Sequence, residues 1–215
     1  MLGIFIILLF VISSQLPIIF VINKNLITKV IVGWYSFGIV IGYIEFCMFI
    51  NQTYMSSDNC LINDNNSWYF KSYPISDIFT TRIWADSWKE YCIQSGDFRY
   101  LETVTYDFVP WIELINAILA FIVGIFIIIG TVTNKYKRVY TTIAIIMISS
   151  TQIFGTIIYL MSYYTKCFYK IKTINLMWFI HLIGMNILWI IFPLILSVDS
   201  IKYIISETLI TTYVR

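Results

Sequence analysis

The stretch VPWIELINAILAFIVGIFIII, residues 109–129, contains one charged side chain, Glu113, and is otherwise almost entirely apolar. A run of about 18 or more apolar residues is the sequence signal of a helix that spans a bilayer. At 1.5 Å per residue, about 20 residues cross ~30 Å of hydrocarbon, and a helix satisfies its own backbone hydrogen bonds in lipid. This segment therefore predicts a transmembrane helix.

Four further segments have similar length and composition: residues 2–22, 30–50, 140–161 and 176–198. The first lies where a signal peptide would, but it lacks a basic region before its apolar stretch, so we interpret it as a true span. Of the 215 residues, 59% are hydrophobic and 12% are charged, whereas soluble domains carry about 25% charged residues. The sequence predicts an all-α polytopic membrane protein, a bundle of five transmembrane helices with one long polar loop.

That loop, residues 52–108, contains eight of the twelve Asp and Glu residues of the chain. Cys60 and Cys92 also lie in it, and sequons begin at Asn51 and Asn65. Paired cysteines and sequons suit the cell exterior or the endoplasmic reticulum lumen. The sequence leaves open whether the cysteines pair and whether the sequons are used.

Lys and Arg residues divide equally between the two sides of the membrane, seven on each, so only those in the shortest connections indicate an orientation. Lys24 and Lys29, and the cluster from Lys135 to Arg138, occupy the shortest connections, which the positive-inside rule places in the cytosol. The N-terminus and the long loop are then lumenal, and the C-terminus is cytosolic. The net charge of +2 and the small size of the basic cluster predict no nucleic-acid partner. The four cysteines show no CxxC spacing, so we expect neither a metal site nor a cofactor.

Polar side chains inside the spans are the candidates for function. Insertion scales assign a cost of about 2.5–3.5 kcal/mol to a charged residue at the centre of a span, so each needs a partner or a cavity. Two carboxyl groups qualify, Glu45 in the second span and Glu113 in the third. Further candidates are Asn116, Gln152, Thr156, Tyr159, Trp178, His181, Asn186 and Trp189.

Helical spacing groups several of these residues on common faces. Glu113 and Asn116 are three residues apart, as are Asn186 and Trp189, while Gln152, Thr156 and Tyr159 follow one stripe. We expect these stripes to converge on an interior cavity. The alternative is that they only join helices by hydrogen bonds of about 0.6 kcal/mol each. His181, the only histidine, lies five residues before Asn186, about 140° round an α-helix, so we expect it to face elsewhere.

Five short blocks follow one another on this membrane pattern. They are Trp34-Tyr35 with Glu45; Trp88-Lys89-Glu90-Tyr91 followed by Gly96-Asp97-Phe98-Arg99-Tyr100; Asp107-Phe108 with Glu113; Gln152-Ile153-Phe154-Gly155 with Tyr159; and Met185-Asn186-Ile187-Leu188-Trp189 with Pro193. In content and order they resemble the emopamil-binding protein family, membrane sterol Δ8–Δ7 isomerases that share the EXPERA domain. The resemblance runs from about Trp34 to Asp199.

The chain departs from the family pattern at four places. The family's isomerases place a histidine four residues before the first glutamate, where this chain has Ile41. The threonine that follows the second glutamate is Asn116, and the aspartate after the glycine of the fourth span is Thr156. The Trp-Gly-Pro of the third span reads Ala120-Phe121-Ile122. The scaffold therefore matches the family more fully than the catalytic residues do.

The resemblance implies a site at which Glu45 and Glu113 are catalytic, delivering a proton to C9 of the sterol and removing one from C7. It implies substrate contacts from Asn116, Gln152, Tyr159, Asn186 and Trp189. An aromatic face such as Trp189 can stabilise the intermediate cation by about 2 kcal/mol.

The expected function is therefore that of a sterol Δ8–Δ7 isomerase of the cholestenol delta-isomerase type in the endoplasmic reticulum membrane. Its expected partners are the lipid bilayer and a sterol or cationic amphiphile ligand, and a homodimer stays open. Because Ile41 replaces the histidine, a non-catalytic sterol- or amphiphile-binding protein is the main alternative, and a structural or chaperone-like membrane partner is a third. We divide the chain into a first helix with its connection (1–29), an EXPERA-like four-helix membrane domain (30–200) and a C-terminal tail (201–215).

Overall fold

The computed structural model describes residues 3–55, 68–95, 109–133, 138–166 and 176–213. These residues are almost entirely helical and include no strand. Among them, five helical segments are long and apolar enough to cross a membrane: Gly3–Val21, Leu26–Ile50, Pro110–Thr133, Arg138–Thr165 and Phe179–Thr208. The predicted all-α bundle of five transmembrane helices is confirmed.

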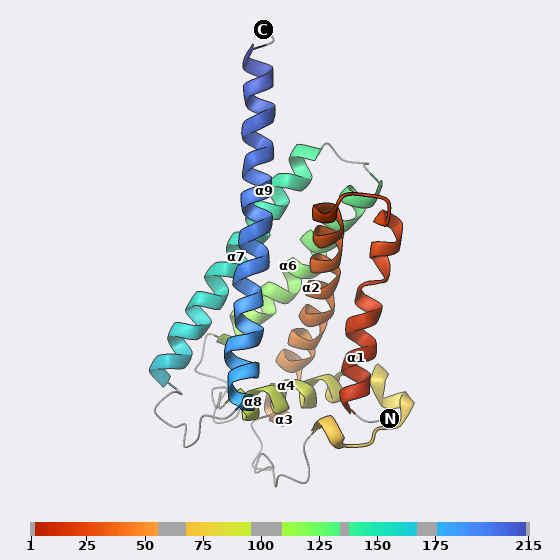
Figure 1. Ribbon diagram of the computed structural model, residues 1–215. Helices are drawn as coiled ribbons and strands as arrows, with labels where there is room; N and C mark the ends of the chain where they lie inside the picture. Colours follow the sequence, from red (N-terminus) through yellow and green to blue (C-terminus); the bar gives the residue numbers. More distant parts are fainter. Residues whose placement is uncertain (1–2, 56–67, 96–108, 134–137, 167–175, 214–215) are drawn as a thin grey trace.

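The first two spans form an antiparallel pair (Figure 1). Helix α1 (Gly3–Ser14) is followed by the 3₁₀ helix η1 (Leu16–Val21). Pro17 explains this change, because proline has no N–H and its ring clashes with the carbonyl group four residues earlier. Helix α2 (Leu26–Ile50) begins at Asn25, whose side-chain oxygen accepts hydrogen bonds from the backbone N–H of Thr28 at 3.0 Å and from its hydroxyl at 2.6 Å.

The remaining spans are α6 (Val109–Thr133), α7 (Arg138–Lys166) and a continuous helical segment near the C-terminus. That segment comprises α8 (Leu176–Trp178), the π-helical turn η7 (Phe179–Gly184) and α9 (Met185–Tyr213). Helix α9 extends beyond the other helices (Figure 1). Residues 201–213, assigned to a tail by the sequence analysis, continue this helix.

Helices α2 and α6 approach closely at Gly42. A Cβ atom added there would lie 3.1 Å from the Cα atom and 3.3 Å from the carbonyl oxygen of Ala117, and 3.2 Å from the Cβ atom of Ala120. Small residues at a membrane-helix interface allow backbones to come together in this way. Gly42 lies three residues before Glu45, and Ala117 lies four residues after Glu113, so this contact brings the two carboxyl groups to the same level of the bundle.

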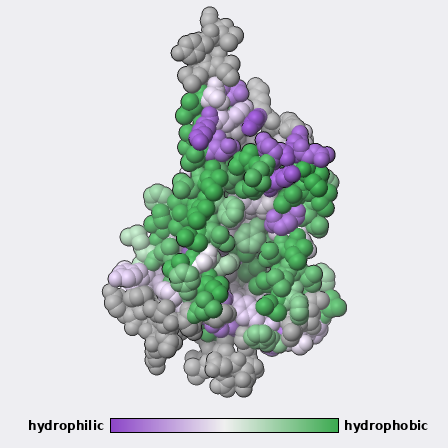
Figure 2. All heavy atoms as spheres, viewed as in Figure 1, coloured by the Kyte–Doolittle hydropathy of each residue, from purple (hydrophilic) through white to green (hydrophobic). Residues whose placement is uncertain are grey.

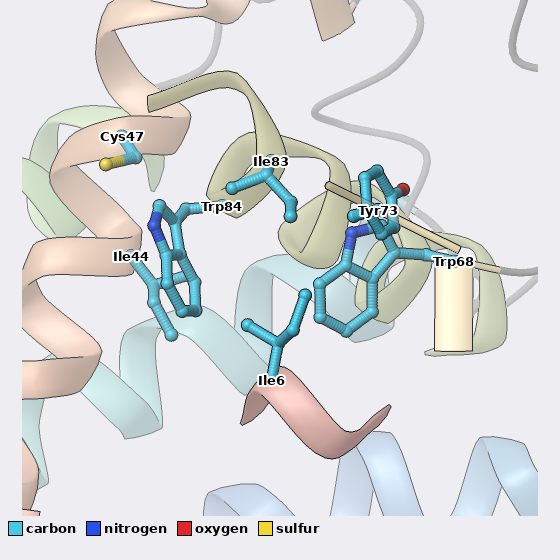
Figure 3. Close-up of a cluster of buried hydrophobic side chains, with 7 residues drawn as sticks. All are labelled: Ile6, Ile44, Cys47, Trp68, Tyr73, Ile83 and Trp84. Atoms are coloured by element: carbon cyan, nitrogen blue, oxygen red, sulfur yellow. The ribbon is translucent and has the colours of Figure 1, made fainter. Parts of the chain in front are cut away.

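The polar segment between α2 and α6 contains an amphipathic helix that the sequence analysis did not predict. Helix α4 (Thr81–Ser95) lies across one end of the bundle (Figure 1). It is preceded by α3 (Gln52–Met55) and the 3₁₀ helices η3 (Trp68–Phe70) and η4 (Ile75–Phe79). Trp84 of α4 packs with Ile44 of α2, while Ile6 of α1 faces Trp68 of η3 (Figure 3). This cluster fixes α4 against the first two spans.

The N-terminus lies at the end of the bundle that carries α4, and the C-terminus lies at the opposite end (Figure 1). This is the arrangement that five spans require. Figure 2 shows hydrophobic residues in a band around the middle of the molecule, with hydrophilic residues gathered toward the two ends. The band matches the surface that a lipid bilayer would cover.

Candidate functional site

A cavity of about 390 Å³ lies between α1, α2, α4, α6, α7 and the π turn with α9. Ligand cavities in proteins typically measure about 300–1,000 Å³ and have apolar walls with a few polar groups. All seven site residues predicted from the sequence line it: Glu45, Glu113, Asn116, Gln152, Tyr159, Asn186 and Trp189. The structure thus brings together side chains from four spans.

Two carboxyl groups meet at this cavity. Glu45 of α2 and Glu113 of α6 are both buried, with 7% and 9% of their surfaces exposed, and their carboxyl groups lie close enough to interact. An ionised carboxylate can only accept hydrogen bonds, so two carboxylates cannot bond to each other. Two ionised carboxylates side by side in an apolar site also repel each other, so this arrangement favours a shared proton. This gives the cavity a group that can donate a proton beside a group that can accept one.

Trp34 connects α2 to α7 and α9 beside the cavity. Trp34 of α2 donates its indole N–H to the side-chain oxygen of Gln152 at 3.3 Å. The ring of Trp34 also packs edge-on against Trp189, with 4.9 Å between the ring centroids, and stacks on Phe192 at 4.8 Å. Trp189 thus presents an aromatic ring to the cavity from a position held on one side by Trp34.

Asn116 and Thr156 occupy the positions where the family pattern differs. The side chain of Asn116 lies against Gly155 of α7, because a Cβ atom added to Gly155 would be 3.4 Å from the amide nitrogen of Asn116. The hydroxyl of Thr156 donates to the backbone carbonyl of Gln152 at 2.8 Å. Ile41, the counterpart of the family's histidine, also lines the cavity. An imidazole is therefore absent from the wall at this point, and an aliphatic side chain takes its place.

Hydrogen-bonded polar groups from α4, α7 and α9 lie at the end of the cavity that α4 covers. The Asn186 amide donates to the Tyr91 hydroxyl at 3.1 Å and to the Leu182 carbonyl at 2.6 Å. The Tyr91 hydroxyl lies 3.3 Å from the Tyr159 hydroxyl. Tyr91 comes from α4, Tyr159 from α7 and Asn186 from α9, so three elements are joined through hydroxyl and amide groups.

The prediction that His181 faces away from Asn186 is wrong. His181 is buried, lines the same cavity and forms a hydrogen bond with the Tyr69 hydroxyl. The prediction assumed an α-helix, whereas residues 179–184 form a π-helical turn. A π turn has i→i+5 hydrogen bonds, so its wider turn brings residues five apart toward one face. Such π turns occur frequently at functional sites.

Sequence reasoning missed the contribution of the polar segment to the cavity. Tyr69 of η3 and three residues of α4, Ser87, Trp88 and Tyr91, line the cavity, as do Ile4 and Ile7 of α1. The signal for α4 was present, because Ile83, Trp84, Ser87, Trp88, Tyr91 and Cys92 recur at helical spacing. The acidic composition of the surrounding segment obscured this pattern.

Glu90, the acidic residue of the Trp88–Tyr91 block, supports the fold near the site. It is 1% exposed, and its carboxyl oxygens accept hydrogen bonds from the backbone N–H of Trp68 at 3.0 Å and from the Gln94 amide at 2.8 Å. Burial, and then the charge of Glu90, raises the pKa of the Tyr69 phenol. Tyr69 therefore stays protonated near neutral pH and can donate to the His181 ring.

We expect Glu90→Ala to lower the stability of the protein by about 1–3 kcal/mol, because it leaves the buried N–H of Trp68 without its acceptor. The measurement is thermal unfolding of the purified full chain in detergent. Gln94→Ala is the matched control, since it removes a half-buried partner of Glu90 but keeps the bond to Trp68. Equal unfolding temperatures for the two variants would contradict this structural role.

Several residues singled out above lie outside the part of the chain that the structure describes. These are the block Gly96–Tyr100, Asp107-Phe108, Cys60 and the sequon at Asn65. Asn51 is described, and its side-chain nitrogen donates to the Cys47 carbonyl at 2.8 Å and to the Thr81 hydroxyl at 3.2 Å. That nitrogen is the atom to which a glycan would be attached. Within the described ranges, His, Cys, Asp and Glu side chains form no group of three that could hold a metal ion.

A comparison with protein-family models matches residues 83–200 to the family described as EBP: EXPERA (EXPanded EBP superfamily). The match covers more than half of the chain and includes most of α4, all of α6 and α7, the π turn and the part of α9 that lines the cavity. A search of curated proteins finds no match. Glu45 and Ile41 lie before the matched range, and their place in the site follows from the packing of α2.

Proposed function

Because this chain belongs to the EXPERA family of the EBP superfamily, we propose that it is a sterol Δ8–Δ7 isomerase of the endoplasmic reticulum membrane. The observation that carries this proposal is the pair of buried, adjacent carboxyl groups, Glu45 and Glu113, in a largely apolar cavity between membrane helices. A substrate that enters such a cavity must be mostly apolar, as a sterol is.

The reaction moves one double bond and needs no net change in protons. The protonated carboxyl group donates its proton to C9, and the π electrons of the C8–C9 double bond form the new C9–H bond. The cation left at C8 is neutralised when a carboxylate removes a proton from C7 and the C7–H electrons form the C7–C8 double bond. One proton enters and one leaves, so two proton-handling groups suffice.

The cavity offers support for the intermediate cation. Trp189 contributes an aromatic face, and a cation over such a face gains about 2 kcal/mol when water is excluded. The carboxyl pair adds negative charge when it holds only one proton. Asn116 and Asn186 supply amide groups to the same cavity, and in this proposal they orient the carboxyl groups and the substrate.

In this proposal, His181 supplies the imidazole that is missing because Ile41 stands at the position of the family's histidine. The Tyr69 hydroxyl forms a hydrogen bond with the Nε2 atom of His181 and so fixes the orientation of the imidazole ring. Both residues line the same cavity as the carboxyl pair. In this proposal, His181 takes part in returning the proton between the carboxyl groups after each turnover.

We expect His181→Gln to lower the isomerisation rate by about 10²-fold or more, the lower end of what a general acid–base group contributes. If its imidazole replaces the one missing at Ile41, the double variant Ile41→His, His181→Gln should recover part of the lost rate. The measurement is conversion of a Δ8 sterol by membranes that contain equal amounts of each variant. A wild-type rate for His181→Gln would remove His181 from the mechanism.

The function itself is tested by complementation of a sterol-isomerase-deficient strain, followed by sterol profiling. The expected result is accumulation of Δ7 sterols at the expense of Δ8 sterols. The alternative function, binding of a sterol or cationic amphiphile without catalysis, is favoured by the aliphatic side chain of Ile41 in the cavity wall. It predicts an unchanged sterol profile together with saturable binding of an ammonium-bearing sterol analogue by the purified chain. Loss of both conversion and binding would overturn both functions.

A further inference from the structure

A second cavity lies at the end of the bundle opposite α4. It measures about 420 Å³ and is separate from the cavity that holds the carboxyl pair, with no lining residue in common. The start of α2, the end of α6, the start of α7 and residues 199–203 of α9 enclose it. These segments meet at the end where the C-terminus lies, and Figure 2 shows hydrophilic residues gathered there.

We propose that this cavity binds a phosphate group, either the headgroup of an anionic lipid or a free phosphate, through Lys24, Arg138 and the Thr141 hydroxyl. Lys24 and Arg138 carry positive charge, and Asp199 is the acidic residue that lines the same cavity. The formal charge of the lining is therefore positive. The proposal is independent of the proposed isomerase function.

The buried hydroxyl of Thr141 is the feature that points to a ligand in this cavity. It is 6% exposed, lines the cavity, and its buried hydroxyl has no hydrogen-bond partner among the described residues. The threonines beside it differ in this respect, because Thr142 donates to the Arg138 carbonyl at 2.8 Å and Thr28 donates to the Asn25 side chain at 2.6 Å. A buried polar group without a partner is unfavourable, and an acceptor oxygen in the cavity would satisfy it.

Arg138 is held in a position that suits phosphate binding. Its guanidinium lies 4.1 Å from the centroid of the Tyr203 ring. Stacking on an aromatic face leaves the N–H groups at the edge of the guanidinium free to donate two parallel hydrogen bonds to an anion. Such bidentate, charge-assisted bonds are the geometry by which arginine recognises phosphate.

The helix ends add to the positive electrostatic potential of the cavity. Helices α2 and α7 both begin at the cavity, and the N-terminal end of a helix carries partial positive charge and backbone N–H groups without helical partners. The C-terminal end of α6 contributes the opposite partial charge. Two helix N-termini and two basic side chains thus contribute positive charge at the cavity, and one helix C-terminus and one carboxylate contribute negative charge. The basic residues of the shortest connections favour a cytosolic position for this end of the bundle, and anionic lipids are enriched on the cytosolic side.

The test is thermal unfolding of the purified full chain in the presence of three probes: phosphatidylglycerol, phosphatidylcholine and inorganic phosphate. We expect phosphatidylglycerol to raise the unfolding temperature in a saturable way and phosphatidylcholine to have no such effect. A rise with inorganic phosphate as well would identify free phosphate as a sufficient ligand. A rise with phosphatidylglycerol alone would identify the lipid headgroup as the source.

Two variants and a control locate the effect. Arg138→Gln should weaken binding of the stabilising probe by about tenfold or more, since it removes a charge-assisted pair. Thr141→Val should weaken binding while leaving the ligand-free unfolding temperature unchanged or raised, because it removes an unsatisfied hydroxyl. Lys202→Gln removes the same charge from an exposed position outside the cavity and should bind as the wild type does. Equal binding by all variants, or equal stabilisation by phosphatidylcholine, would overturn the proposal.

Discussion

Glutamine in place of Glu113 is expected to lower conversion of a Δ8 to a Δ7 sterol by about 10²–10⁴-fold, the range that one general acid–base group contributes. Glutamine has the shape of glutamate, and its amide can donate a hydrogen bond to the neighbouring Glu45, so we expect the packing of α2 against α6 to be preserved. What the variant lacks is a proton that it can give up and recover. The rate should therefore fall without a matching fall in protein level.

Sterol profiling of membranes that contain equal amounts of protein measures this effect. Glu207→Gln is the matched control, because it makes the same change on an exposed part of α9 beyond the cavity. Glu45→Gln should behave like Glu113→Gln, since both members of the pair handle protons in the proposed reaction. Wild-type conversion by both glutamine variants would end the isomerase proposal, whereas binding of a cationic sterol analogue could still support the alternative function.

Alanine at Gly42 is expected to reduce both stability and conversion. The new Cβ atom would lie 3.1 Å from the Cα atom of Ala117, which is backbone and cannot rotate away. Overpacking of this kind costs about 1–3 kcal/mol, against a gain of about 1 kcal/mol from the higher helix propensity of alanine. If α2 and α6 move apart, Glu45 and Glu113 separate, and a displacement of about 1 Å at a reacting group can cost 10²-fold in rate.

Gly38→Ala provides the comparison for this variant. Gly38 lies one turn earlier on α2, and a Cβ atom added there meets nothing within 4 Å. Both variants gain the same helix propensity, so the difference between their unfolding temperatures reports the contact with Ala117. We expect Gly38→Ala to be as stable as the wild type or more stable. If Gly42→Ala also matched the wild type in stability and conversion, the close approach of α2 and α6 would not be what positions the carboxyl pair.

Two kinds of variant distinguish the chemical role of the carboxyl pair from its role in packing. In the folded protein, Glu45 and Glu113 lie side by side in a largely apolar cavity, so they affect both packing and chemistry. Substitution by glutamine removes the chemistry, and Gly42→Ala disturbs the packing. If the glutamine variants and Gly42→Ala all lose conversion, but only Gly42→Ala loses stability, proton transfer is assigned to the carboxyl side chains themselves.

The five spans and the candidate polar residues could be read from the sequence because hydropathy is a local property. Twenty apolar residues in a row must cross the bilayer as a helix, whatever they pack against. A glutamate within such a run needs a partner or a cavity, which is why Glu45 and Glu113 could be singled out without knowledge of the fold. Spacing of three and four residues also placed Gln152, Thr156 and Tyr159 on one face of α7 correctly, and all three line the cavity.

The tertiary structure decided which of these residues meet and which others join them. Glu45 reaches Glu113 because Gly42 lets two backbones approach, and no pattern within either segment encodes that contact. His181 enters the cavity because a π turn replaces the α-helix assumed from hydropathy. Helix α4 closes one end because its aromatic face finds a surface on α1 and α2. The physical reason is common to all three: a span is set by its own transfer into lipid, whereas a site is set by packing between segments that are distant in the chain.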